Sequence, residues 1–308
     1  MPSASEQPRP RTAPSDSAFG FYTPLRYPGG KARLGPWIAE TMRHNGISGG
    51  CYVEPYAGGA GAAMFLLCRG YVDRVIVNDL DPVIHAFWIA ATQHAEAFAK
   101  RIESTPVTMD ERVRQQEVVT NHATHDPVDV GFAAFFLNRT SRSGILAGGV
   151  IGGKAQTGNY KLDARFNRAD LAERVRRIGS LRRQIKVLGV DAAELLANLG
   201  PEVAKAGLVY LDPPYFNKGS QLYRNHYQAD DHAEIAQLVI EAGYPLIVTY
   251  DECPEVLELY QGTPFTRFSL RYSTHAGRPE AQELLFYKNL QLPDAPRMSK
   301  SLRVSSTL

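Results

Sequence analysis

The chain has 308 residues, 44% of them hydrophobic and 21% charged, with a formal net charge of +2. A chain of this length and apolar content buries a large core, so disorder is not expected. No run approaches the ~18 apolar residues that span a bilayer, and the opening residues lack the apolar core of a signal peptide. We therefore expect a soluble, cytoplasmic protein. The widely spaced Cys51, Cys68 and Cys253 favour neither a metal site nor a disulfide framework.

The order of apolar and polar segments predicts one interrupted α/β domain. Residues 1–17 are rich in Pro, Ser and Ala and predict a flexible tail, with a second tail at 293–308. Between them, strand-like runs such as DRVIVND alternate with helical runs such as PVIHAFWIAA, which predicts a largely parallel sheet covered on both faces. Strand-like runs are scarce between 91 and 183, where helical segments surround a Gly-rich stretch suited to a hairpin or loop. We interpret 91–183 as a subdomain inserted between the halves 18–90 and 184–292 of one catalytic domain.

A glycine cluster, Glu54–Gly61, follows the first strand-like run and precedes a helical one. Glycines there let the backbone turn tightly at a strand end, where a nucleotide-like ligand can approach closely. Asp79 ends the next strand 18 residues after Gly61, near the offset at which an acid accepts ribose hydroxyls. The spacing is not GxGxxG, because Ala60 follows Gly59, so a nicotinamide dehydrogenase is disfavoured. A tight turn and a helix cap remain the structural alternatives.

The tetrapeptide Asp212-Pro213-Pro214-Tyr215 directly follows the apolar run GLVYL and is the strongest signal in the sequence. Two prolines fix the backbone past the strand end and remove two N–H donors. The Asp212 carboxylate and the Pro213 carbonyl can accept both hydrogens of an exocyclic amine and direct its lone pair toward an electrophilic methyl group, with no metal or covalent intermediate. The Tyr215 ring offers a stacking surface worth ~1–3 kcal/mol per base. A proline-stiffened turn with a capping Asp is the alternative.

Basic residues gather in the second half of the insertion. Residues 138–186 hold twelve Lys or Arg against three acids, a net +9. This block is typical of a surface that follows phosphates, with the Gly-rich segment placed to enter a groove; for residues 174–183, a solvated helix face is the alternative. A polar stretch that follows the tetrapeptide contains Tyr223, Asn225 and Tyr227. These three residues could form a lid over an extruded adenine, or they could belong to a surface loop.

The order of these segments resembles the D12-class N6-adenine-specific DNA methyltransferases, which include the Dam enzymes, from about residue 22 to 288. The matching segments are Tyr27-Pro28-Gly29-Gly30-Lys31, EPYAGGAG from Glu54, Asn78-Asp79, Phe136-Leu137-Asn138-Arg139-Thr140, and DPPY from Asp212. The resemblance implies a Rossmann-like, S-adenosylmethionine-dependent methyltransferase sheet with an inserted, mostly helical or hairpin subdomain for target recognition. It implies a site-specific, adenine-specific enzyme that methylates N6 by direct in-line attack on a flipped base.

The same resemblance assigns residues to the cofactor and to DNA. It places Asp79 on the ribose and Asp191 near the cofactor adenine, although Asp191 can equally cap the next helix. The full set for S-adenosylmethionine is Tyr27, Lys31, Glu54, Pro55, Tyr56, Gly58, Gly59, Asp79, Asp191 and Asp212. The set for DNA is Asn138, Arg139, Arg142, Lys154, Lys161, Tyr223, Asn225 and Tyr227. The implied partners are double-stranded DNA and, in a restriction-modification system, a cognate restriction enzyme, with the chain a monomer or weak dimer.

Other reactions fit the sequence less well. Cytosine C5 methylation needs a Cys nucleophile after Pro, whereas the sequence has the reverse order, Cys253-Pro254. Cytosine N4 methylation is chemically close, but Ser more often replaces the first Asp there. Methylation of RNA or protein amines usually uses Asn first. A catalytically silent DNA-binding homologue would have no use for the intact tetrapeptide, glycine cluster and Asp79 together.

Overall fold

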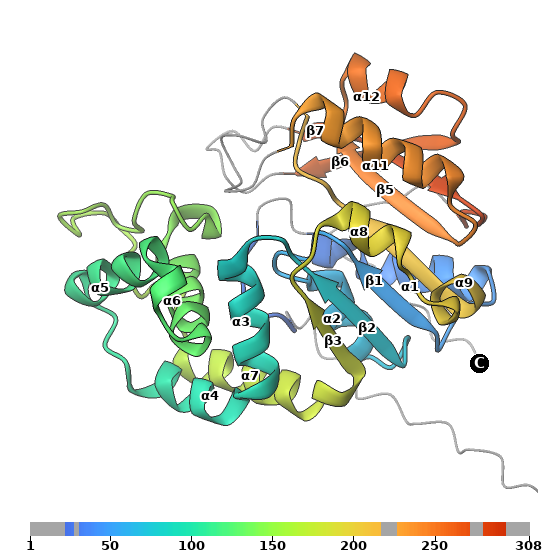
Figure 1. The fold of residues 1–308 in the computed structure, drawn as a ribbon. Coiled ribbons are helices and arrows are strands. Elements are labelled where there is room, and N and C mark those ends of the chain that lie inside the picture. The colour runs from blue at the N-terminus through green and yellow to red at the C-terminus, as the bar shows by residue number, and fades with distance from the viewer. Residues whose placement is uncertain (1–21, 28–30, 217–226, 272–279, 294–308) are drawn as a thin grey trace, which may run out of the picture.

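The computed structural model describes residues 22–27, 31–216, 227–271 and 280–293 (Figure 1). Seven strands of these residues form one sheet in the order β3-β2-β1-β4-β5-β7-β6. Strands β1 to β5 pair in parallel and β7 is antiparallel to both of its neighbours. Their bounds are β1 Cys51–Glu54, β2 Arg74–Asn78, β3 Ile185–Leu188, β4 Gly207–Leu211, β5 Leu246–Asp251, β6 Phe265–Arg271 and β7 Glu280–Lys288. The largely parallel α/β sheet predicted from the sequence is confirmed, with an antiparallel edge added.

Side chains alternate between two buried faces of the sheet. Tyr52 and Val75 enter one hydrophobic cluster, whereas their neighbours Val53 and Ile76 enter the other. This is the period of two that a strand imposes. The first face packs on α1 (Gly35–His44) and α2 (Gly61–Cys68), and η1 (Lys31–Leu34) precedes them. The second face packs on α8 (Ala192–Ala197), α9 (Pro201–Ala206), α11 (Ala229–Glu241) and α12 (Pro254–Leu259).

Five helices separate β2 from β3 and form the lobe beside the sheet (Figure 1). They are α3 (Pro82–Gln93), α4 (Ala95–Ser104), α5 (Met109–Thr120), α6 (Pro127–Thr140) and α7 (Arg168–Ser180), with short η2 (His122–Thr124), η3 (Arg142–Gly144) and η4 (Arg182–Gln184) turns. Side-chain caps begin four of these helices: Asp81, Thr108, Asp126 and Asn167. Inside the lobe, Phe98 meets Phe87, Phe132 and Phe135 edge to face. This aromatic core is continuous with the first face of the sheet.

The start of the insertion differs from the sequence prediction. The boundary expected at residue 91 falls inside α3, because that helix packs its apolar residues into the core shared with the sheet. The Gly-rich stretch, predicted as a hairpin or loop, forms turns with one isolated antiparallel bridge, Ser141 to Val150. Among the described residues, none of the helices has the length and apolarity to cross a membrane.

Candidate active site

Asn78, the last residue of β2, forms hydrogen bonds that connect the turn after β1 to the turn after β3. Its side-chain amide donates to the carbonyls of Pro55 (2.9 Å) and Val190 (3.0 Å), and its Oδ1 accepts the Val190 N–H (3.1 Å). The Ala57 N–H donates to the Asn78 carbonyl at 2.9 Å. Asn78 is fully buried, so these bonds are shielded from water. The turns that follow β1 and β3 are therefore held in one fixed arrangement.

Within this turn, Gly58 has a backbone conformation that other residues rarely adopt, and a side chain there would displace Tyr27. Its φ is +47°, and a Cβ there would lie 2.6 Å from the ring of Tyr27. Its carbonyl accepts the indole N–H of Trp88 at 2.9 Å, which ties the turn to α3. Ala60, with φ +42°, adopts the left-handed conformation at the start of α2 although it carries a Cβ. Tyr27 thus packs directly against the backbone of the turn.

Asp79 stands beside this turn, one residue past the end of β2. Its two carboxylate oxygens accept the N–H groups of Gly58 (2.8 Å) and Asp81 (3.0 Å). Burial raises the pKa of Asp79 to about 7, and the two backbone hydrogen bonds oppose that rise. A carboxylate here changes charge near neutral pH and faces the same strand edge as the glycine turn.

Glu54 lies beneath the turn and is buried, with 5% of its surface exposed. Its Oε1 accepts the Ala63 N–H at 3.0 Å, in the first turn of α2. Burial raises the pKa of Glu54 to about 8, the Ala63 N–H opposes that rise, and the nearby Asp212 adds to it. Predicted as a cofactor residue, Glu54 here supports the start of α2 and lies near Asp212 of the tetrapeptide.

Asp191 and Tyr56 occupy the same edge of the sheet. Asp191 Oδ1 accepts the Ala193 N–H at 2.8 Å and caps α8, so the capping alternative raised from the sequence is present. The Tyr56 hydroxyl donates to the Tyr227 hydroxyl at 3.0 Å, and their rings meet edge to face. The structure therefore brings one cofactor candidate and one DNA candidate into direct contact.

The tetrapeptide follows β4, at the point where the strand order reverses between β1 and β4. Ligands of open α/β sheets bind outside the carboxyl ends of strands at such a point. Asp212 Oδ1 accepts a hydrogen bond from the Thr249 hydroxyl at 2.8 Å, and Thr249 lies 2.9 Å from the Tyr210 hydroxyl. The Tyr215 hydroxyl donates to the buried Glu283 of β7 at 3.0 Å. Both ends of the tetrapeptide are thereby anchored to strands.

Sequence reasoning missed these anchors. Thr249 and Glu283 are fully buried polar residues next to the apolar runs LIV and LLF of their strands, and a polar residue beside a buried apolar run was the available signal. The segment after Tyr215 is also held, because the Phe216 N–H donates to Asp251 Oδ1 at 3.3 Å. Tyr227, one of the residues predicted to form a lid or a surface loop, packs on His232, whose ring nitrogen lies 2.9 Å from the Tyr250 hydroxyl.

Two residues predicted to bind DNA have internal roles instead. Asn138 is fully buried: its Oδ1 accepts the Arg26 N–H at 2.8 Å, and its amide donates to the carbonyls of Arg26 (2.7 Å) and Gly144 (2.8 Å). Arg139 is 8% exposed and donates from Nε to the Pro24 carbonyl at 2.7 Å. Burial lowers the pKa of Arg139 to about 9, with nearby arginines contributing. These contacts argue against direct DNA contact by either residue, because both side chains pin residues 24–26 to the insertion.

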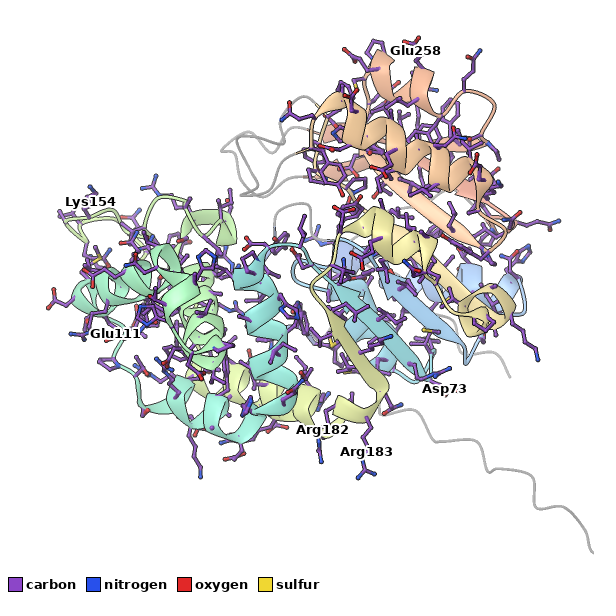
Figure 2. The ribbon with its side chains drawn as sticks, in the orientation of Figure 1. Asp73, Glu111, Lys154, Arg182, Arg183 and Glu258 are labelled. Carbon is purple, nitrogen blue, oxygen red and sulfur yellow. The ribbon has the colours of Figure 1, made fainter. Side chains whose placement is uncertain are left out.

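Several side chains of the basic block, residues 138–186, are also engaged within the protein, so fewer of them are available to contact phosphates than the net charge suggested. Arg176 forms ion pairs with Glu96 and Glu103, and Arg168 donates to carbonyls at the end of α4. Arg174 pairs with Asp170. Figure 2 shows Lys154 at one end of the lobe and Arg182 and Arg183 at another, so these three basic residues do not share one patch. The candidates that remain exposed are Arg142, Lys154 and Lys161, the last of which donates to the Gln156 carbonyl.

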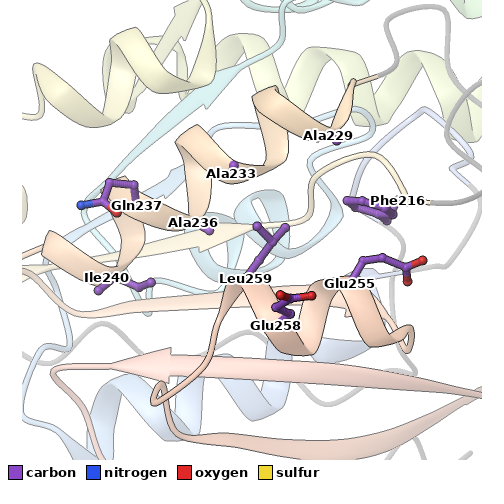
Figure 3. Close-up of a pocket in the computed structure, with 9 residues that line it drawn as sticks. All are labelled: Phe216, Ala229, Ala233, Ala236, Gln237, Ile240, Glu255, Glu258 and Leu259. Atoms are coloured by element: carbon purple, nitrogen blue, oxygen red, sulfur yellow. The ribbon is translucent and has the colours of Figure 1, made fainter.

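Three predicted site residues cannot be placed: Tyr223 and Asn225 lie outside the described residues, as does the side chain of Lys31. A groove of about 420 Å³ lies between α11 and α12 (Figure 3). Its lining includes Ala233, Ala236 and Leu259, with Phe216 at one end. Of the predicted cofactor and DNA residues that the structure describes, none lines this groove.

The sheet order defines an α/β protein with a Rossmann-like, seven-stranded sheet and a candidate site at its switch point. Residues 27–274 match the model of the D12 class N6 adenine-specific DNA methyltransferases, and the chain belongs to that family. A comparison with curated protein sequences gave no match.

Solved structures that resemble this chain do so only distantly. A putative RNA methyltransferase from Pyrococcus horikoshii is 12% identical, with 85% of this chain and 84% of that chain covered and a TM-score of 0.38. An rRNA methyltransferase from Streptomyces viridochromogenes is 13% identical, with 90% and 94% covered and a TM-score of 0.37. A SAM dependent methyltransferase from Agrobacterium tumefaciens is 9% identical, with 83% and 61% covered and a TM-score of 0.34. Likenesses this weak transfer neither substrate nor mechanism.

Proposed function

We propose that the protein transfers a methyl group from S-adenosylmethionine to N6 of adenine in double-stranded DNA. The observation that carries the proposal is the Asp212 carboxylate, bonded to Thr249 at the switch point of the sheet. Family membership supports methyl transfer and names adenine in DNA as the substrate. The exposed Arg142, Lys154 and Lys161 are the proposed phosphate contacts on the insertion.

The groups at the glycine turn fit S-adenosylmethionine. Asp79 provides a carboxylate acceptor for a vicinal diol, beside a Cβ-free backbone at Gly58 that is covered by Tyr27. Asp191, at the end of the neighbouring turn, is the proposed contact for the cofactor's adenine. When bound, the cofactor supplies an electrophilic methyl group on a sulfonium. The residues of the turn bind and orient it toward the tetrapeptide.

The tetrapeptide would act on the target amine by position and charge. An aryl amine is a weak nucleophile because its lone pair is delocalised into the ring. The Asp212 carboxylate and the Pro213 carbonyl would accept hydrogen bonds from its two N–H groups and direct the lone pair toward the methyl group, and the amine would lose one of these protons once it is methylated. Tyr215, held by Glu283, would stack on the base. Because N6 cannot be reached by the enzyme inside a duplex, the adenine is proposed to be flipped out of the helix.

Binding of S-adenosylmethionine is expected to weaken as the pH falls from 8 to 6. Asp79 has a pKa raised to about 7, so it carries its proton below that pH and then accepts the ribose hydroxyls less well. Calorimetric titration across this range measures the effect. The stability of the fold changes with pH in the opposite direction to cofactor binding. Because the pKa of Asp79 is raised in the folded protein, the free protein loses stability as the pH rises toward 7. An Asp79→Asn variant should bind more weakly and lose the pH dependence; an unchanged dependence would exclude Asp79 from the ribose contact.

Methyl transfer to oligonucleotides with labelled cofactor tests the proposed function. Nuclease digestion and mass spectrometry should find N6-methyladenine. N4-methylcytosine would favour the chemically close alternative, and transfer to RNA alone would overturn the DNA assignment. A protein that binds DNA without measurable affinity for S-adenosylmethionine would be the silent homologue.

A further inference from the structure

We propose that Thr249 is a positioning residue that fixes the orientation of the Asp212 carboxylate, with Tyr210 supporting it from behind. The three side chains come from β4, from β5 and from the loop that follows β4. The inference rests on the proposed function, in which Asp212 accepts a hydrogen of the target amine.

The strand register explains why these side chains meet. β4 and β5 are parallel, and Leu211 pairs with Val248. Asp212 follows Leu211, and Thr249 follows Val248. The Asp212 carboxylate therefore lies beside the Thr249 hydroxyl. The contact distance is 2.8 Å. Thr249 is fully buried and Tyr210 is 3% exposed, so water does not compete for these groups.

The directions of the two hydrogen bonds follow from the number of hydrogens that each group can donate: none for the carboxylate and one for each hydroxyl. An ionised carboxylate only accepts, so the single hydroxyl hydrogen of Thr249 points at Asp212. Thr249 must then accept from the Tyr210 hydroxyl, 2.9 Å away. The chain runs in one direction, from Tyr210 to Thr249 to Asp212. Each bond polarises the next, and the carboxylate is held before substrate arrives.

A purely structural role would not require this hydroxyl. The flanking residues Val248 and Tyr250 are buried in a strand whose apolar members pack the core, where Val would fill the position of Thr249 with nearly the same shape. A buried hydroxyl costs free energy unless it is hydrogen-bonded. The Thr249 hydroxyl is bonded to Asp212 and to Tyr210, so it links the tyrosine to the carboxylate.

Steady-state kinetics of three variants test the proposal. Thr249→Val should lower kcat about 10- to 100-fold, because a misplaced reacting group costs up to about 100-fold. The KM values for DNA and S-adenosylmethionine should stay within about threefold. Thr249→Ser, which restores the hydroxyl, should recover kcat to within about threefold of the wild type. Tyr210→Phe should lower kcat about three- to tenfold through the loss of one hydrogen bond.

The double variant Thr249→Val, Tyr210→Phe separates positioning from packing. Because Thr249→Val already breaks the chain, adding Tyr210→Phe should lower kcat no further. Multiplicative losses, or a Thr249→Ser variant as slow as Thr249→Val, would overturn the proposal. If Thr249→Val does not fold, the kcat values of Thr249→Ser and Tyr210→Phe decide the matter. A fully active Tyr210→Phe together with a slow Thr249→Ser would contradict the proposed chain of hydrogen bonds. A wild-type protein that transfers no methyl group fails the proposed function itself, independently of these ratios.

Discussion

Replacing Asp212 with Ala should reduce kcat for methyl transfer by at least about 10²- to 10³-fold, the cost of removing one preorganised group from a charge-stabilising site. The substitution removes the carboxylate that would accept a hydrogen bond from the target amine, and it also removes the acceptor of the Thr249 hydroxyl hydrogen. Affinity for S-adenosylmethionine should change little, since the glycine turn and Asp79 are untouched. Single-turnover kinetics and calorimetry on the same preparation measure both quantities.

A capping residue of the insertion provides the matched control. Asp126 Oδ1 accepts the Val128 N–H at 2.8 Å at the start of α6. Asp126→Ala should lower the free energy of unfolding by about 1 kcal/mol and leave kcat unchanged. Normal turnover by Asp212→Ala would remove the tetrapeptide from the chemistry.

Replacing Asn138 with Ala should lower the free energy of unfolding by about 2–4 kcal/mol. The substitution leaves the N–H and carbonyl of Arg26 and the carbonyl of Gly144 without their partner, and an unsatisfied buried group costs about 1–3 kcal/mol. Urea unfolding followed by circular dichroism measures the loss. Residues 24–26 should become more accessible to protease at the same time.

If Asn138 contacted DNA, as the sequence predicted, the Asn138→Ala variant would behave differently. A residue that contacts DNA would leave the stability unchanged and weaken DNA binding. The exposed Asn121, at the end of α5, serves as the control, and Asn121→Ala should change the stability by less than about 0.5 kcal/mol. An Asn138→Ala protein as stable as the wild type would return Asn138 to the DNA surface.

The tetrapeptide and the glycine turn could be predicted from the sequence because each is a run of consecutive residues after a strand. Their supports could not, because Thr249 and Glu283 lie 37 and 68 residues from their partners in the tetrapeptide. Only the strand register brings them together. A single Thr in LIVTYD, or a Glu in ELLFYK, marks a buried polar residue but does not name its partner.

The basic block shows a different limit of the sequence. Counting charges between residues 138 and 186 omits Glu96 and Glu103, which come from an earlier helix and pair with Arg176. The count also treats Arg139 as a surface residue, although the core of the insertion buries it. Net charge along the chain therefore overestimated the cation surface that remains for phosphates.

The most direct test of the central claim is to sequence DNA from cells that express either the wild-type protein or Asp212→Ala, with detection of modified bases. We predict N6-methyladenine at a defined sequence context in the first DNA and none above background in the second. A folded, expressed wild-type protein that leaves adenine unmodified, or the same modification in both samples, would contradict the account.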